Sequence, residues 1–287
     1  MRLSKLVIGG AQFGQSYGID SSKVNQKEIK KLFNYLKKKN HKIIYDSSPN
    51  YGDSEKIILK MGLSNSSIIT KIKDIPKELD KIKAYIEKFV IDYNKKNKKN
   101  IYAILLHDEK ELSNLKRLQF ITKIFIKMKK HRLIKKYGYS IYDYKKYRKN
   151  ILRAKPDILQ FPYNIIDNRI KDYHLKELKK KNIILHARSV FLQGLLLCES
   201  AKLPKKFKRF KKTWEKYEKE LKKNNQTMLQ ACLGHVLFNK YLDKIVIGFK
   251  SLKQLKEIDK IKLVRKNFFF PRVHIQDKLF LINPYKW

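Results

Sequence analysis

Short apolar runs alternate with longer amphipathic segments along most of this chain. Eight runs are bounded by turn-forming residues and predict strands over Leu6–Ala11, Ile43–Tyr45, Ile68–Ile72, Tyr102–His107, Tyr137–Ile141, Asp157–Phe161, Ile183–Ser189 and Ile245–Gly248. Apolar residues spaced three and four apart predict helices between most of these strands. The first follows Asn25 and Glu28, which resemble a capping box.

Three further helices are predicted from the same spacing. One begins at Gly52–Glu55 and ends near Gly62, a second covers Pro76–Asn94, and a third includes Leu115–Met128, with a polar loop expected at Lys95–Asn100. Since parallel strands need crossover connections, strands that alternate with helices predict a parallel sheet.

Eight such strands predict a closed (β/α)8 TIM barrel of the α/β class. We expect a single domain over residues 1–287, with a barrel core at about 5–260 and a C-terminal tail, 261–287, that lies with the loops over the barrel. An open doubly wound sheet is the alternative. It is disfavoured because Gly9, Gly10 and Gly14 do not form the GxGxxG motif of its phosphate-binding turn.

Polar residues stand at the carboxyl ends of the predicted strands, where the sites of such barrels form. They are Asp46, Lys71, His107, Ser140, Gln160, Arg188, Ser189, Lys250 and Ser251. Each alone has a structural explanation: Asp46 could cap a turn, Lys71 could be a surface charge, and His107 a hydrogen-bonded core histidine. Together with Tyr51, they place an acid, a phenol, an ammonium and an imidazole at one rim.

Composition limits the other functional classes. The formal net charge of +42 suggests a nucleic-acid partner, but the charge is mostly lysine and is spread over every helical segment, which favours a solvated surface. The two cysteines, Cys198 and Cys232, offer neither a disulfide framework nor a metal-binding pair. With no long apolar run and no signal-peptide pattern, we expect a cytoplasmic protein with no metal and no membrane partner.

Four motifs carry a resemblance to a known family. They are Asp46 followed by Tyr51-Gly52-x-Ser54-Glu55, the strand-end pair Thr70-Lys71, the segment Leu-Leu-His107-Asp108, and Gly248-x-x-Ser251. Through them the sequence resembles the aldo/keto reductase superfamily from about Leu6 to Glu257. The resemblance implies a monomeric or homodimeric NADPH- or NADH-dependent reductase of a small carbonyl compound, with NADP(H) as the usual cofactor.

The resemblance also implies the roles of the site residues. Asp46, Tyr51, Lys71 and His107 would form the catalytic tetrad. The cofactor would contact Ser140, Gln160, Arg188, Ser189, Gly194, Gly248, Lys250, Ser251 and Gln254.

Two positions depart from the family pattern. Ile141 stands where many members have an asparagine that holds the nicotinamide amide, and Gln254 stands nearest to the usual arginine for the 2′-phosphate. Lys250, Lys253 or Lys256 could meet that phosphate only as point charges.

Such a tetrad suits hydride transfer to a carbonyl group, which builds negative charge on the carbonyl oxygen. Tyr51 would act as the general acid, Lys71 would stabilise its phenolate, and Asp46 would hold Lys71 in place. His107 would orient the substrate carbonyl.

Substrate choice is expected to depend on loops. Candidate pocket walls are Phe191–Lys206, the Tyr17 region and the aromatic tail Asn267–Trp287, although Phe268, Phe269, Phe270, Leu279 and Leu281 could instead pack on barrel helices or form a dimer contact. Because its loops are short, the sequence resembles bacterial reductases of sugar or surface-polysaccharide pathways more than steroid or aldose reductases, which implies a sugar-type carbonyl. Two other classes remain open: a non-catalytic, cofactor-binding barrel that acts as a sensor or regulatory subunit, and a basic nucleic-acid-associated protein.

Overall fold

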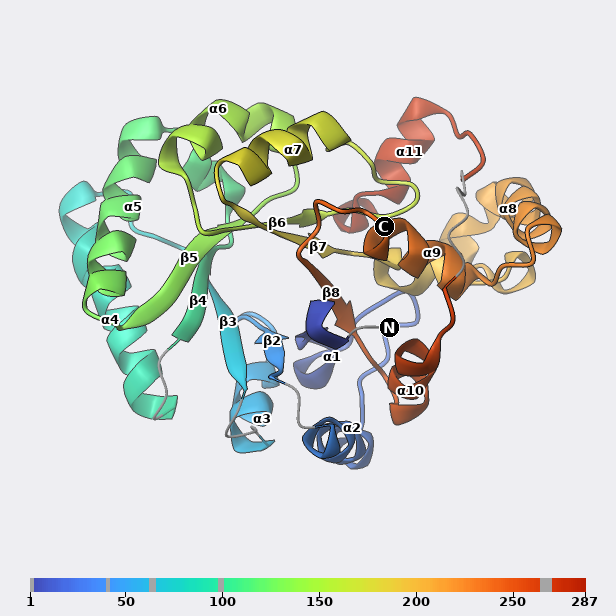
Figure 1. Cartoon of the computed structure of the whole chain (residues 1–287), viewed down its shortest axis with the longest axis horizontal. Coiled ribbons are helices and arrows are strands. Elements are labelled where there is room, and N and C mark those ends of the chain that lie inside the picture. Colours follow the sequence, from blue (N-terminus) through green and yellow to red (C-terminus); the bar gives the residue numbers. More distant parts are fainter. Residues whose placement is uncertain (1–2, 40–41, 62–65, 98–100, 264–269) are drawn as a thin grey trace.

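Eight parallel strands form a closed barrel in which every strand pairs with its neighbours in chain order (Figure 1). The computed structural model describes residues 3–39, 42–61, 66–97, 101–263 and 270–287. The strands are β1 (Leu6–Gly9), β2 (Ile44–Asp46), β3 (Ser67–Ile72), β4 (Ile101–Leu106), β5 (Ile134–Ser140), β6 (Ile158–Pro162), β7 (Ile184–Arg188) and β8 (Lys244–Gly248). The predicted (β/α)8 TIM barrel is therefore confirmed.

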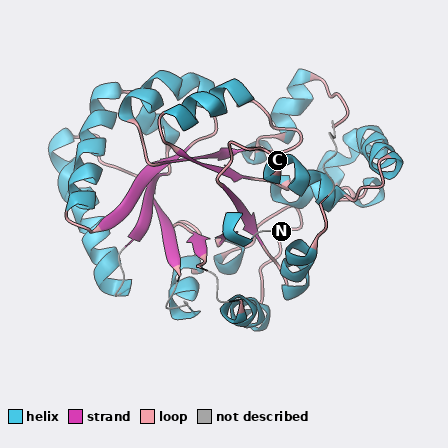
Figure 2. Cartoon of the chain, viewed as in Figure 1, coloured by secondary structure: helices cyan, strands magenta, loops and turns pink. Residues whose placement is uncertain are grey.

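Helices surround the barrel and connect its strands (Figure 2). They are α1 (Ala11–Gly14), α2 (Gln26–Lys38), α3 (Ser54–Met61), α4 (Leu79–Asn97), α5 (Leu115–Lys130), α6 (Tyr144–Ala154), α7 (Asp172–Lys180), α8 (Lys211–Lys223), α9 (Met228–Leu237), α10 (Leu252–Lys260) and α11 (Ile275–Leu281). The expected cap forms on α2, where the Asn25 side chain accepts a hydrogen bond from the Glu28 backbone N–H.

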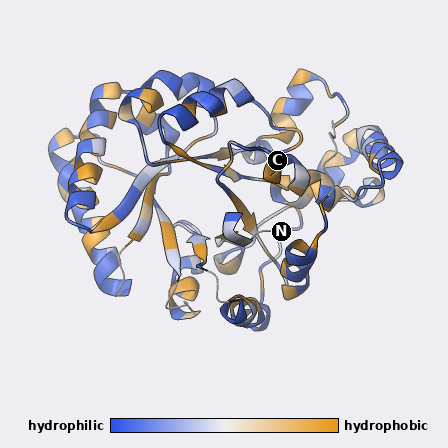
Figure 3. Cartoon of the chain, in the orientation of Figure 1, coloured by the Kyte–Doolittle hydropathy of each residue, from blue (hydrophilic) through white to orange (hydrophobic). Residues whose placement is uncertain are grey.

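Two layers of apolar side chains stabilise the barrel. A small cluster that includes Val7, Ile69 and Leu105 belongs to the strands, and a larger cluster joins the strands to the surrounding helices. Hydrophilic residues, drawn blue in Figure 3, are frequent along these helices. The alternation of polar and apolar positions thus sorts each helix into a buried and a solvated face.

Some predicted boundaries are wrong. The first strand ends at Gly9, because Ala11 already begins α1. Helix α4 continues through Asn97, where the polar loop Lys95–Asn100 was expected. Lysines in its last turn are compatible with a helix, since they interact favourably with its carboxyl-terminal dipole. Gly62 and the positions 98–100 lie outside the described residues.

A second apolar cluster lies beside the barrel, where α8 and α11 extend away from the ring of helices (Figure 1). Trp214 and Tyr217 of α8 pack there with Leu281 of the tail. The tail both packs and lines a cavity: Leu281 is buried, whereas Leu279 and Ile282 line the cavity described below. Phe268 and Phe269 lie outside the described residues.

Candidate active site

The four expected tetrad residues lie at one mouth of the barrel. Asp46 ends β2, Lys71 is the penultimate residue of β3, and His107 directly follows β4. Tyr51 lies in the connection between β2 and α3. Because these strands are neighbours in a parallel barrel, their carboxyl ends bring side chains distant in sequence to the same rim.

Asp46 and Lys71 form a buried ion pair. The Lys71 ammonium lies 2.5 Å from Asp46 Oδ1 and also donates a 2.9 Å hydrogen bond to the Ser47 carbonyl. Their side chains are only 6% and 1% exposed, respectively, so the pair is shielded from water. Burial is the largest single influence and acts to lower the pKa of Lys71, but the charges and hydrogen bonds of Asp46 and Tyr51 together raise the pKa above its usual value. Lys71 is therefore a cation at neutral pH.

Tyr51 lies against this cation, with the Lys71 ammonium 4.9 Å from the centre of its ring. The loop that carries Tyr51 is fixed by close packing: a Cβ atom on Gly14 would come within 1.9 Å of the Tyr51 carbonyl oxygen. Ser54 Oγ also donates a 2.8 Å hydrogen bond to the Gly10 carbonyl. The position of the phenol therefore depends on glycines that follow β1.

His107 faces Tyr51 edge-on, with ring centres 6.0 Å apart and an interplanar angle of 86°. Its Nδ1 lies 3.4 Å from Ser48 Oγ. Burial, assisted by the charge of Lys71, lowers the pKa of His107 to about 4. A neutral imidazole therefore stands beside the phenol at neutral pH, where it can donate or accept a hydrogen bond.

Gln160 and Ser140 extend the network below the tetrad. Gln160 Nε2 donates a 2.7 Å hydrogen bond to Asp46 Oδ2, the carboxylate oxygen that Lys71 does not contact. The Ser140 hydroxyl donates to Gln160 Oε1 over 3.4 Å. Both were expected to contact a nicotinamide, and their hydrogen bonds show that they also support the acid–ammonium pair.

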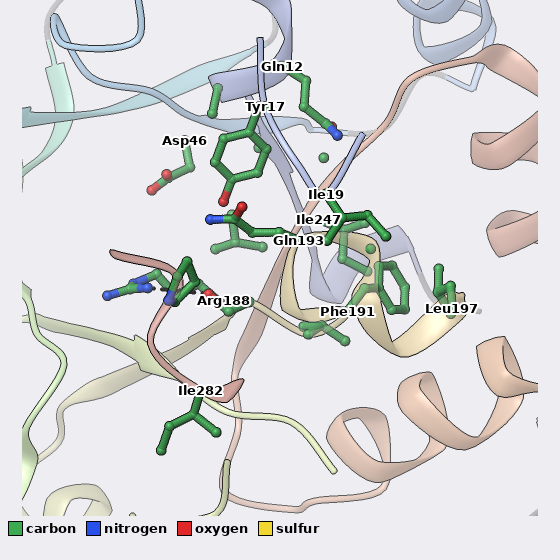
Figure 4. A pocket seen from close by; sticks show the side chains of 18 of the residues that line it. Gln12, Tyr17, Ile19, Asp46, Arg188, Phe191, Gln193, Leu197, Ile247 and Ile282 are labelled. Carbon is green, nitrogen blue, oxygen red and sulfur yellow. Dashed lines mark hydrogen bonds between the residues drawn. The ribbon is translucent and has the colours of Figure 1, made fainter. Parts of the chain in front are cut away.

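A cavity of about 1880 Å³ opens above the tetrad (Figure 4). Its lining includes most of the predicted site residues: Asp46, Tyr51, His107, Ser140, Gln160, Arg188, Ser189, Gly194, Gly248, Lys250 and Gln254. Lys71 lies behind Tyr51, and Ser251 instead caps α10 through the Gln254 backbone N–H. Since typical small-molecule pockets measure about 300–1000 Å³, this cavity has room for a dinucleotide together with a second small molecule.

Loops from both ends of the chain approach one another along the cavity. Lys250 donates hydrogen bonds to Asp20 and, over 2.9 Å, to Ser22 Oγ, and the Ile19 backbone N–H donates to the Gln193 carbonyl over 3.1 Å. Gly194 adopts a φ of +98°, which an L side chain rarely tolerates. The connections after β1, β7 and β8 therefore form one wall of the cavity.

One buried polar atom in this wall fits a nicotinamide cofactor. The side-chain oxygen of Gln12 is buried and has no hydrogen-bond partner among the described residues, and a Cβ atom on Gly248 would lie 2.2 Å from it. An unpaired acceptor at a close backbone approach suits a ligand that brings an N–H donor, such as a carboxamide. The residues present therefore fit the cofactor that the sequence implies.

Sequence reasoning did not identify several residues of this site. Gln12, Ser22 and Ser48 lie in the connections after β1 and β2, and Tyr142 stacks on Arg188 with 4.0 Å between its ring centre and the guanidinium carbon. Gln12 could have been found, because it follows a predicted strand end as Asp46 does. The others depend on loop conformation, which strand patterns do not predict.

The described part of the chain contains no group of three or more His, Cys, Asp or Glu side chains arranged to hold a metal ion. Within the same ranges, no helix is long and apolar enough to cross a membrane.

A parallel eight-stranded barrel with these polar side chains at its mouth defines the chain as an α/β-barrel protein with a candidate active site. The family model "Aldo/keto reductase family" matches residues 5–264. The chain belongs to the aldo/keto reductase family, which supports the function of a carbonyl oxidoreductase that uses a nicotinamide cofactor.

Solved structures share the fold at low sequence identity. An aldo-keto reductase from Bacillus halodurans in its holo form superposes with a TM-score of 0.69 at 17% identity, over 91% of this chain and 88% of that one. The glycerol dehydrogenase of Gluconobacter oxydans gives 0.67 at 16% identity, over 98% and 93%. No curated protein matches the sequence significantly.

Proposed function

We propose that this protein reduces an aldehyde or ketone, such as a sugar-type carbonyl, to an alcohol, with Tyr51 as the general acid. The observation that carries the proposal is the juxtaposition of Asp46, Lys71, Tyr51 and His107 at the rim of one large cavity. When bound, the reduced nicotinamide supplies the hydride that goes to the carbonyl carbon.

The proton goes to the carbonyl oxygen from the Tyr51 hydroxyl. As negative charge grows on that oxygen, a donor placed beside it stabilises the transition state. The Lys71 ammonium, 4.9 Å from the Tyr51 ring centre, stabilises the phenolate that remains after transfer. Asp46 keeps Lys71 charged and in place, because its carboxylate holds the ammonium at 2.5 Å in a buried setting.

His107 positions the substrate. Its pKa of about 4 keeps the imidazole neutral, so it donates a hydrogen bond to the carbonyl oxygen without competing as an acid. Its edge-on contact with Tyr51 brings that donor to the same side of the cavity as the phenol.

NADPH is proposed as the preferred cofactor. Lys250 is already paired with Asp20, so its charge is largely compensated. Lys253 lies at the start of α10, beside Gln254, and its exposed ammonium can meet a 2′-phosphate as a point charge.

The decisive test measures cofactor binding by fluorescence with NADPH and NADH, followed by cofactor oxidation with a panel of small aldehydes and ketones. We expect saturable binding and turnover of at least one carbonyl compound. Binding without turnover of any member of a broad panel would instead favour a sensor or regulatory barrel.

A further inference from the structure

Arg188 is a cation inside the catalytic mouth. It ends β7 and lines the same cavity as Tyr51 and His107. Figure 4 shows its side chain in the wall of the cavity that also includes Asp46, Tyr17 and Ile282. A guanidinium at this depth requires compensation, because burial disfavours charge.

The contacts of Arg188 hold the guanidinium in place but leave donors unused. It donates to the Ile141 carbonyl over 3.1 Å and to Ser189 Oγ over 3.3 Å. Its guanidinium carbon lies 4.0 Å from the centre of the Tyr142 ring. The Tyr142 side chain is a further hydrogen-bond partner of the guanidinium. Since a guanidinium has five N–H donors, these neutral partners use only part of its capacity.

No carboxylate of the described residues forms an ion pair with Arg188, whereas three other arginines are paired. Arg117 binds Glu111, Arg148 binds Glu177, and Arg169 binds Asp167, each through an ion pair. Near the tetrad, Asp46 is engaged by Lys71 and Gln160. Arg188 is therefore a positioned cation whose anionic partner is not a side chain in the described ranges.

An anion bound to Arg188 would lie in the same cavity as Tyr51 and His107. Burial and then the charge of Lys71 are the main causes that lower the pKa of His107, and the charge of Arg188 contributes further. Arg188, Tyr51 and His107 also line the same cavity, so one ligand in it can meet the guanidinium and the imidazole. A ligand that contacts both groups would carry an anionic group close to its carbonyl.

We propose that Arg188 binds a carboxylate or phosphate group of the substrate, so that the physiological substrate is a small anionic aldehyde or ketone. This inference rests on the proposed reductase function and specifies its substrate class. The planar fork of a guanidinium suits two oxygens of one anion, and stacking on Tyr142 fixes its plane in advance. In this assignment Arg188 recognises the substrate, whereas the sequence resemblance placed it at the cofactor.

The test compares matched anionic and neutral aldehydes in steady-state kinetics with NADPH. Succinic semialdehyde is paired with butanal, and glyceraldehyde phosphate with glyceraldehyde, so that the two arms separate carboxylate from phosphate. We expect the wild type to prefer one anionic member by at least about tenfold in kcat/KM. In Arg188→Met this preference falls by about 10- to 100-fold, the size of a lost charge-assisted hydrogen bond.

Lys146→Met is the matched control, because Lys146 is an exposed cation at the rim of the same cavity and the charge change is identical. We expect Lys146→Met to leave the anionic preference within about threefold of the wild type. Arg188→Lys should keep more of the preference than Arg188→Met does, since a lysine supplies the positive charge without the planar fork of the guanidinium. Equal loss on both members of each pair, or a wild type without anionic preference, would overturn the inference and leave the reductase proposal intact.

Anion binding has a readout that does not need turnover. Succinate and inorganic phosphate are added to the NADPH-loaded protein, and the unfolding temperature is measured for the wild type and Arg188→Met. A rise in the wild type that is absent in the variant supports the anion site even if no aldehyde in the panel is reduced. Weaker NADPH binding by Arg188→Met, with no anion-dependent rise in either protein, would assign Arg188 to the cofactor and refute the inference.

Discussion

The side-chain amide of Gln160 donates a hydrogen bond of 2.7 Å to Asp46, although 114 residues separate them in the chain. Asp46 ends β2 and Gln160 lies in β6, so closure of the barrel brings them together across its mouth. One oxygen of the carboxylate binds Gln160 and the other binds Lys71. The acid of the tetrad is thus held from both sides of the barrel.

Replacing Gln160 with leucine is expected to impair both stability and turnover. It leaves Asp46 Oδ2 buried without its donor, which costs about 1–3 kcal/mol in the free energy of unfolding. The freed carboxylate also holds Lys71 less firmly, so kcat is expected to fall by about tenfold. Urea denaturation and steady-state kinetics measure the two effects; an unchanged kcat would show that Lys71 needs no support from Gln160.

The Tyr51→Phe variant is expected to bind NADPH normally and to lose turnover by a factor of roughly 100 to 10,000, the contribution of a general acid. The ring and its contact with Lys71 are kept, whereas the hydroxyl, which is the proton donor and also a hydrogen-bond partner of Lys71, is removed. Fluorescence titration and cofactor oxidation measure the two properties. Tyr147→Phe is the control, because Tyr147 lines the same cavity from α6; wild-type activity in Tyr51→Phe would remove Tyr51 as the donor.

Gly14→Ala is expected to displace the loop that carries Tyr51. The added methyl group would lie 1.9 Å from the Tyr51 carbonyl and 2.3 Å from the Ser54 amide nitrogen, so backbone must move. Such overpacking costs about 1–3 kcal/mol, and we expect kcat to fall with stability. Gly234→Ala in α9 is the control. Its methyl group would meet only Phe238 ring atoms at 3.6 Å or more, and it should stabilise the helix by up to about 1 kcal/mol.

NADPH preference is expected to depend on the first turn of α10. In Lys253→Gln, NADPH should bind about three- to tenfold more weakly, whereas NADH binding should not change, because only NADPH carries the 2′-phosphate. Lys260→Gln, at the last residue of the same helix, removes the same charge as a control. If the binding of NADPH and of NADH weakens equally, Lys253 attracts the negative charge that both cofactors share and does not recognise the 2′-phosphate.

The barrel and the meeting of Asp46, Lys71 and His107 at one rim were predictable because both follow from local patterns. A strand end can be predicted where an apolar run meets a polar residue. In a closed parallel barrel these ends lie at the same rim, so Asp46, Lys71 and His107, which are distant in sequence, lie near one another. The short strand at Tyr137 was recognised for the same reason, although it begins earlier, at Ile134.

Residues that act through loop geometry were not predictable. The pairing of Lys250 with Asp20 spans 230 residues and depends on how two connections fold over the rim. Likewise, no periodicity predicts that Tyr142 would stack on Arg188, since Tyr142 lies in the turn between β5 and α6. The second apolar cluster, around Trp214, requires the segment after β7 and the tail to meet. Such long-range meetings follow only from tertiary structure.

Buried His186 is expected to make the protein acid-sensitive. The side chain is 1% exposed, its Nδ1 lacks a hydrogen bond, and burial lowers its pKa to about 4. In the unfolded chain the pKa is near 6.5, so below this value the unfolded state binds a proton that the folded state excludes. The contribution of this group to the free energy of unfolding is therefore complete above about pH 6.5 and is lost as the pH falls towards about 4, by up to about 3 kcal/mol.

Denaturant unfolding at several pH values measures the slope of the free energy of unfolding against pH. His186→Gln should reduce the slope but not abolish it, because burial also lowers the pKa of His107 and of His235 to about 4. His131→Gln, at an exposed position after α5, should leave the slope unchanged, and the same slope in all three proteins would refute the assignment.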